Sequence, residues 1–264
     1  MKALLVVLLS LPLAAEDAAY VILKTGERFA VQEKAEEVLA DFAAWVAPRV
    51  GQPSLVGRIT NRPDEALTRV RESKPLFAIV TPAFYLEHRE ALGLALLAQT
   101  RRRGLAAEKY AVIARKGATE TPAKVATSLM AEEPYLRKVA LAGGPSSVDF
   151  AESSWIGDDV AAMAEGDPEA PEAVLVDRAT LEFLREDEVL WGELSVTFES
   201  ADLPPDAVVA FSWTPEDVRV KLSTALLAMK EDVRGKEVCD LMQTDGFGPV
   251  DEALWAEAGG RWSK

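Results

Sequence analysis

Short apolar runs separated by helical patterns constrain the fold of this chain more than any other feature. These runs are AYVILK (19–24), LFAIV (76–80), YAVIAR (110–115), KVALAG (138–143), AVLVD (173–177), LSVTFES (194–200) and VVAFSW (208–213). Short runs rich in Val, Ile and Phe are typical of buried strands. Strands that alternate with helices predict an α/β fold with largely parallel sheets.

Two segments between these runs have helical periodicity. Residues 32–48 and 215–233 each place apolar side chains three and four positions apart, which predicts one buried face on each helix. The second segment follows Thr214 and begins with Pro215. Because a threonine is a good N-cap and proline is favoured at the first helical position, we expect a helix to begin there.

The N-terminal segment MKALLVVLLSLPLAA predicts export. One positive residue, Lys2, precedes an apolar run over residues 3–13, followed by small residues. The run is shorter than the roughly 20 residues that span a bilayer. We therefore expect a signal peptide cleaved after Ala15 and a periplasmic mature protein, although a first core strand or an uncleaved anchor would give a similar pattern. No cysteine follows the run, so no lipid anchor is expected.

Charge and cysteine content limit the partners and the crosslinks of the chain. Cys239 is the only cysteine, so no internal disulfide can form. The net charge of −14 argues against nucleic acid and anionic membrane surfaces as partners. It also means that local donors must hold any anionic ligand. The length suffices for one large domain or two lobes.

Catalytic and metal chemistry have little support in the sequence. His88 is the only histidine, and no G-x-S-x-G motif is present, so an exported hydrolase that uses His88 is a minor alternative. Zinc sites with several His or Cys ligands are excluded, and no nucleotide phosphate loop occurs. The acid pairs 132–133 and 158–159 are interpreted as solvated helix faces. We expect no catalytic residue, no metal and no cofactor.

The first candidate binding turn follows the apolar run 76–80. Thr81 and Pro82 stand between the strand and a helical pattern that contains Phe84 and Tyr85. A helix N-terminus offers free N–H groups to an anion, so the turn is a candidate binding loop. The alternative is a capped connection without a ligand.

The second candidate turn follows the run 138–143. There we expect a strand that ends at Gly143, then Gly144 and Pro145, and then Ser146 and Ser147 at the start of a helix. Glycines permit close backbone approach, and the hydroxyl groups with exposed N–H groups would form an oxyanion site. An ordinary Gly-Ser turn with an N-cap explains the same residues.

Taken in order, several segments resemble the solute-binding proteins of phosphate, phosphite and phosphonate ABC transporters. The segments are VQEKAEEVLADFAAWVAPRVGQP, FAIVTPAFY, YAVIARKGA, VALAGGPSS, AVLVD, ESADLPPDAVVAF and TDGFGPVDEALWA. That family is a branch of the type II periplasmic binding proteins. The resemblance implies two lobes, each a mainly parallel sheet flanked by helices, joined by hinge crossings at 109–116 and 194–201. It places the signal peptide at 1–15, the first lobe at 16–112 and 197–264, and the second lobe at 113–196.

The resemblance also implies the binding residues. Thr81 and Tyr85 match the family's first turn, with Thr81 in place of its usual glycine, and Ser146 and Ser147 match its phosphoryl-binding turn. Asp177 falls where the family can place an acid that contacts an amino group of the ligand. The histidine that helps to hold a phosphonate has no counterpart around 155–157, which favours a different oxyanion or weaker binding.

The resemblance implies a monomeric exported protein that captures a small oxyanion between its lobes and delivers it to an ABC transporter permease. The alternative is a sensory or scaffolding descendant of the same fold that contacts a membrane receptor or a partner protein. A cleft packed with apolar side chains would favour this alternative.

Overall fold

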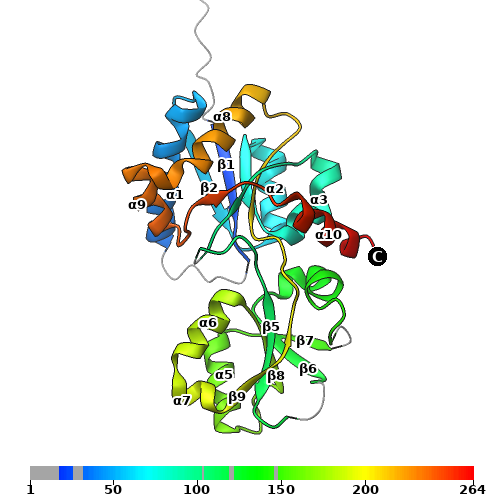
Figure 1. Cartoon of the computed structure of the whole chain (residues 1–264). Helices are drawn as coiled ribbons and strands as arrows, with labels where there is room; N and C mark the ends of the chain where they lie inside the picture. The colour runs from blue at the N-terminus through cyan, green and yellow to red at the C-terminus, as the bar shows by residue number, and fades with distance from the viewer. Residues whose placement is uncertain (1–17, 26–31, 103, 119–121, 146–147) are drawn as a thin grey trace, which may run out of the picture.

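The protein has two lobes, each built around its own sheet (Figure 1). The computed structural model describes residues 18–25, 32–102, 104–118, 122–145 and 148–264. We call the lobe with the six-stranded sheet the first lobe and the lobe with the five-stranded sheet the second lobe. The apolar run 3–13 and the serines at 146 and 147 lie outside the described residues.

The six-stranded sheet has the order β11-β4-β10-β3-β1-β2. Its strands are β1 (Ala18–Leu23), β2 (Leu55–Thr60), β3 (Phe77–Val80), β4 (Ala95–Thr100), β10 (Ala207–Ala210) and β11 (Phe247–Gly248). β1 pairs in parallel with β2 and β3, whereas β10 runs antiparallel between β3 and β4. The return strand is therefore inserted into the sheet that the N-terminal half of the chain builds.

The five-stranded sheet has the order β7-β6-β8-β5-β9. Its strands are β5 (Tyr110–Arg115), β6 (Lys124–Thr127), β7 (Asp149–Glu152), β8 (Ala173–Asp177) and β9 (Leu194–Glu199). β6 is parallel to β7 and β8, and β5 is antiparallel to β8 and β9.

Helices flank both sheets (Figure 1). Those of the first lobe are α1 (Gln32–Val50), α2 (Pro63–Ser73), α3 (Pro82–Leu92), α8 (Glu216–Leu227), α9 (Val233–Leu241) and α10 (Glu252–Trp262), with a 3₁₀ turn at Met229–Glu231. Those of the second lobe are a 3₁₀ turn at Met130–Glu132, α4 (Glu133–Tyr135), a π-helical turn at Leu136–Ala140, α5 (Ile156–Glu165), α6 (Arg178–Glu186) and α7 (Glu188–Gly192).

The two helices predicted from periodicity are confirmed, with one change at a cap. α1 and α8 occupy the predicted segments. Thr214, however, does not cap α8, whose N-cap residue is Pro215. The Thr214 hydroxyl instead donates to the Leu76 carbonyl at 2.7 Å and accepts from the Phe211 N–H at 3.1 Å. It therefore ties the loop after β10 to the segment before β3.

The strand predicted at 138–143 is wrong, because residues 138–140 are helical and residues 141–143 form a turn. α4 continues into Leu136–Ala140, and the neighbouring strands are β6 and β7. Leu136, Val139 and Ala140 are all buried, a spacing that fits a helix and not the alternation of a strand. Periodicity cannot distinguish a short, fully apolar strand from a buried helical segment, and this explains the error.

The chain crosses between the lobes twice. β4 lies in one sheet and β5 in the other, so the first crossing is at 101–109; the second, between β9 and β10, is at 200–206. Glu108 and Leu203 join the crossings, since each N–H donates to the other's carbonyl, at 2.8 and 2.9 Å. The lobe boundaries expected at 112/113 and 196/197 fall inside β5 and β9.

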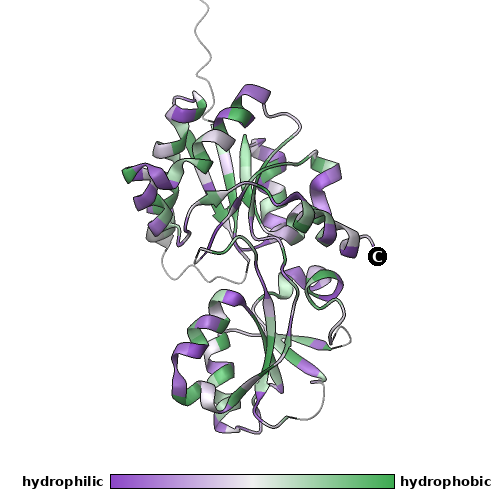
Figure 2. Cartoon of the chain, in the orientation of Figure 1, coloured by the Kyte–Doolittle hydropathy of each residue, from purple (hydrophilic) through white to green (hydrophobic). Residues whose placement is uncertain are grey.

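We call the region where α3 and α10 meet residues 130–140 the lobe junction. The two lobes share part of their hydrophobic core there. One buried cluster combines Ala83 and Leu86 of α3 and Ala258 of α10 with Leu136 and Val139 of the second lobe. Apolar residues concentrate on the strands and on helix faces turned inward (Figure 2). The lobes are therefore packed together.

The helical segment 136–140 and the turn after it make a testable distinction between two alanines. Ala140 is 1% exposed and Ala142 is exposed, whereas in a strand the two would share one face. We expect Ala140→Asp to lower the free energy of unfolding by at least about 3 kcal/mol, because it buries a carboxylate without a partner. Ala142→Asp should change it by no more than about 0.5 kcal/mol. Urea unfolding of both variants tests this. Equal losses of unfolding free energy would favour a strand over a helix in this segment.

Candidate functional site

The N-terminus of α3 lies at the lobe junction. β3 is buried throughout and ends at Val80, after which Thr81 caps the helix and Pro82 occupies its first position. The Thr81 side chain accepts a hydrogen bond from the Phe84 N–H at 3.4 Å. The turn predicted at Thr81-Pro82 is therefore a true strand-to-helix turn, and its capping threonine is 5% exposed.

A carboxyl group of the second lobe lies beside the N-cap residue of this helix. Glu132 is 2% exposed, and its Oε1 accepts a hydrogen bond from the Thr25 hydroxyl at 2.5 Å. The Thr81 side chain also lies near enough to lower the pKa of the Glu132 carboxyl through hydrogen bonding. Thr25 follows β1 and Thr81 follows β3, which are adjacent parallel strands, so both hydroxyls lie at the same edge of the first sheet.

Burial changes the acidity of Glu132. Loss of hydration raises the pKa of its carboxyl from 4.5 to about 7, while the hydrogen bonds from Thr25 and Thr81 act in the opposite direction. The charge of Asp206 adds to the increase. The interpretation of the acid pair 132–133 as a solvated face is wrong for Glu132, because this residue precedes α4 and points toward the other lobe.

The strand-to-helix turn of the second lobe lies at 127–133. β6 ends at Thr127, whose side chain accepts from the Leu129 N–H at 3.2 Å, and the helical segment begins at Glu133 and Pro134. This segment contacts α3 across the junction. Two strand-to-helix turns, one from each lobe, therefore meet with the Glu132 carboxyl between them.

The second turn predicted from sequence, at 143–147, does not have that form. The preceding segment is helical and the following element is β7, so no helix begins there. Ser146 and Ser147 themselves lie outside the described residues. The signal missed in the sequence is Glu133-Pro134 after the short strand KVAT, since an acid and a proline are typical of a first helical turn.

Tyr85 lies one helical turn after Thr81, on the same face of α3. Its ring packs edge-on against Trp255 of α10, with 4.9 Å between the centroids. Partial burial raises the pKa of the Tyr85 phenol above its ordinary value, and the charge of Arg89 opposes this. Tyr85 thus links α3 to α10 beside the junction.

Asp177 lies at the hinge side of the second lobe, at the end of β8. Its carboxylate caps α6 by accepting from the Thr180 N–H at 2.8 Å, and it lies 4.0 Å from the Arg102 guanidinium. Burial, and then the charge of Asp177, raise the pKa of the Glu108 carboxyl to about 7. The predicted residue Asp177 therefore belongs to a cluster of acidic residues at the crossings. It takes no part in the contact that Glu132 makes beside α3.

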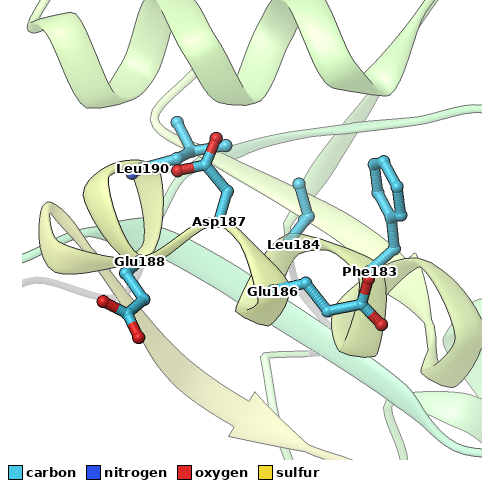
Figure 3. A pocket seen from close by; sticks show the side chains of 6 residues that line it. All are labelled: Phe183, Leu184, Glu186, Asp187, Glu188 and Leu190. Atoms are coloured by element: carbon cyan, nitrogen blue, oxygen red, sulfur yellow. Dashed lines mark hydrogen bonds between the residues drawn. The ribbon is translucent and has the colours of Figure 1, made fainter.

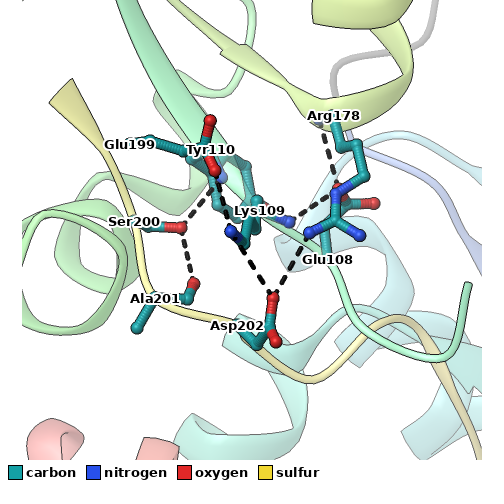
Figure 4. Close-up of polar contacts among 8 residues, drawn as sticks. All are labelled: Glu108, Lys109, Tyr110, Arg178, Glu199, Ser200, Ala201 and Asp202. Carbon is teal, nitrogen blue, oxygen red and sulfur yellow. Dashed lines mark hydrogen bonds and ion pairs between the residues drawn. The ribbon is translucent and has the colours of Figure 1, made fainter. Parts of the chain in front are cut away.

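Further polar contacts tie the two crossings to β9 and α6 of the second lobe (Figure 4). Lys109 pairs with Glu199 at 2.7 Å, and Arg178 pairs with Asp202 at 3.3 Å. The Glu108 carboxylate accepts from the N–H groups of Lys109 and Arg178, at 2.9 and 3.2 Å. These contacts fix the geometry of the hinge segments next to the junction.

Two buried tyrosines lie near the acids of the junction. Burial, and then the charge of Glu132, hold the pKa values of Tyr110 and Tyr135 well above the ordinary value. Tyr135 is fully buried, and its hydroxyl has no hydrogen-bond partner among the described residues. This hydroxyl is a donor that an anion at the junction would satisfy.

Two hollows on the described surface lie away from the junction. One lies at the turn between α6 and α7 and is lined by Phe183, Leu184, Glu186, Asp187, Glu188 and Leu190 (Figure 3). The other lies between α1 and β2 of the first lobe. Within the described ranges, no group of three or more His, Cys, Asp or Glu side chains is placed to hold a metal ion. None of the described helices has the length and apolar character needed to cross a bilayer.

The architecture is that of a type II periplasmic binding protein, with two α/β lobes joined by two crossings. Residues 151–255 match the model of the family described as the periplasmic substrate-binding protein of phosphonate ABC transporters. The resemblance to this family that the sequence motifs predict is therefore confirmed. The comparison with curated proteins gives no match.

Solved structures share the fold at low sequence identity. XAC2383 from Xanthomonas citri, bound to chloride, has a TM-score of 0.73 at 13% identity and covers 93% of this chain and 97% of its own. PhnD1 from Prochlorococcus marinus, in complex with methylphosphonate, has a TM-score of 0.63 at 12% identity, covering 94% and 98%. A binding protein component of a Pseudomonas aeruginosa ABC phosphonate transporter has a TM-score of 0.63 at 14% identity, covering 90% and 82%.

The buried Glu132 carboxyl makes stability depend on pH. Between pH 4.5 and about 7 the folded protein keeps a proton that the unfolded chain releases, so the free energy of unfolding falls as pH rises through this range. The expected loss is about 3 kcal/mol, and Glu132→Gln should remove it. Urea unfolding at pH 5 and pH 7.5 measures the difference.

The control for this measurement is Glu133→Gln, which changes the adjacent, half-buried carboxyl paired with Arg137. It should keep the wild-type pH dependence. Glu108 contributes a change of the same sign in all three proteins. A Glu132→Gln protein with an unchanged pH dependence would show that this carboxyl titrates normally.

Proposed function

We propose that this protein is an exported solute-binding protein that captures a small oxyanion between its lobes for an ABC importer. The oxyanion is of the phosphate, phosphite or phosphonate type. One observation supports the proposal: the junction already holds an oxygen acceptor, the buried carboxyl group of Glu132, beside the Thr25 hydroxyl and Thr81, the N-cap residue of α3.

A carboxylate and a phosphonate present similar oxygen acceptors to the same donors. The donors here are the hydroxyls of Thr25 and Thr81, with the α3 N-terminus behind them. The helix dipole alone contributes only about 0.3–1 kcal/mol at an exposed terminus. Micromolar affinity requires about 8 kcal/mol, so several donors must converge in a closed junction, where exclusion of water strengthens each bond.

The residues expected to contact the ligand come from three parts of the chain. Thr81 and Tyr85 are proposed contacts of the first lobe, and Ser146 and Ser147 are proposed as donors from a segment outside the described residues. Asp177 is proposed to contact an amino group when the ligand carries one. It lies at the hinge, near Glu108, where its acidic surroundings favour a cation.

The comparisons support the class of ligand. A protein with this fold was solved with methylphosphonate, and another is a component of a phosphonate transporter. We propose export through the signal peptide at residues 1–15, without a lipid anchor, and action as a monomer that contacts a transporter permease.

Titration of the mature protein tests the proposal. We expect phosphate, phosphite or methylphosphonate to bind at micromolar concentration in isothermal calorimetry. Thr81→Val should weaken binding roughly 10- to 100-fold, because it removes one charge-assisted hydrogen bond. Thr68→Val is the matched control, since Thr68 is exposed on α2 and bonds only to its own helix. Absence of binding below millimolar concentration for all three anions contradicts the proposal.

A second candidate function is favoured by the filled junction. Apolar side chains of both lobes share one core, and α10 adds the bonds from Arg261 to the Val139 carbonyl and from Lys138 to the Trp262 carbonyl, at 3.3 and 3.2 Å. A protein fixed in this closed form would present a constant surface to a membrane receptor or a partner protein. This is the sensory or scaffolding role predicted as the alternative.

A further inference from the structure

Glu132 has a position that no other charged residue of the described chain shares. It is the only charged residue among the described residues that is almost fully buried, at 2% exposure. Its partners Thr25 and Thr81 belong to the first lobe, whereas Glu132 belongs to the second. The contact therefore exists only while the lobes are closed.

The hydroxyl donors offset only part of the cost of burying Glu132. A buried carboxylate is strongly unfavourable unless hydrogen bonds or opposite charge compensate it. The side chains of Thr25 and Thr81 favour the ionised form, whereas burial favours the neutral form and raises the pKa of the carboxyl to about 7. They are the same groups that the proposed oxyanion would need.

We propose that Glu132 is a tethered competitor of the ligand: its carboxyl group occupies the oxyanion position at α3 and latches the lobes closed without ligand. This inference rests on the proposed function and names the regulation of that same site. A phosphonate or phosphate ion cannot share these donors with Glu132, because its oxygens and the Glu132 carboxyl need the same hydroxyl groups. The free anion therefore binds only when Glu132 leaves.

Tyr135 gives independent support for an anion at this place. It is fully buried three residues after Glu132, and its hydroxyl has no hydrogen-bond partner among the described residues. Burial, and then the charge of Glu132, raise the pKa of this hydroxyl above its ordinary value. When Glu132 leaves, this hydroxyl is a further donor for the incoming anion.

A competitor built into the chain lowers the apparent affinity for the ligand, because only the molecules in which the site is free can bind it. Removing it should therefore tighten binding. We expect Glu132→Ala to lower the apparent Kd for phosphate or methylphosphonate at least tenfold relative to wild type. Glu132→Gln, which keeps the shape without the charge, should lie between the two. Glu133→Ala is the matched control and should bind as wild type does.

A second measurement does not require a ligand. Small-angle scattering of the unliganded proteins should show a larger radius of gyration for Glu132→Ala than for wild type and Glu133→Ala, and saturating methylphosphonate should make Glu132→Ala compact again. Circular dichroism establishes that each variant is folded. If Glu132→Ala misfolds, Glu132→Gln carries both measurements.

The outcomes separate the two proposals. If wild type binds as tightly as Glu132→Ala and the radii are equal, the latch is overturned while the oxyanion-binding function stands. If no protein binds any anion at millimolar concentration, the proposed function fails. The scattering then decides the latch alone: an expanded Glu132→Ala supports it, and an unchanged radius overturns it.

Discussion

The contact between the Glu132 carboxyl and the hydroxyls of Thr25 and Thr81 is the constraint on which the arrangement of the lobes depends. It joins residues 107 positions apart in the case of Thr25, and it buries an ionisable group where two helical segments begin. The topology creates the site, because adjacent parallel strands β1 and β3 bring both threonines to one edge of the first sheet. The apolar core shared by α3, α10 and residues 135–140 also joins the two lobes.

The sequence predicts the elements that have a clear local signal. The strands β1, β3, β5, β8, β9 and β10 and the helices α1 and α8 follow from apolar runs and periodicity, and the turn at Thr81-Pro82 follows from its capping residues. The segment 138–143 fails because all of its apolar positions suit either a buried strand or a buried helix. Because of this error, the second strand-to-helix turn was expected at 143–147, whereas in the structure it lies at 127–133.

The burial of Glu132 could not be predicted locally. An acid pair in an acidic chain is solvated in most cases, and nothing within a few residues of Glu132 distinguishes it from Glu133. Its environment is set by Thr25 and Thr81 of the other lobe. The same holds at the hinge, where the raised pKa of the Glu108 carboxyl depends on burial and on Asp177, a residue of another strand. Sites of this kind can be identified only in the folded structure, where segments distant in the sequence meet.

The charge balance of the junction argues for a ligand that replaces a charge and does not add one. Arg102 lies 4.0 Å from both Asp177 and Asp206, so this cation is already shared by two acids. The hydroxyls at the junction do not fully stabilise even one more charge, since burial raises the pKa of the Glu132 carboxyl to about 7. On the proposed function, an oxyanion that enters while Glu132 leaves would take over the donors that this carboxyl releases. Exchange of one acceptor for another would then allow an acidic protein to hold the proposed anionic ligand.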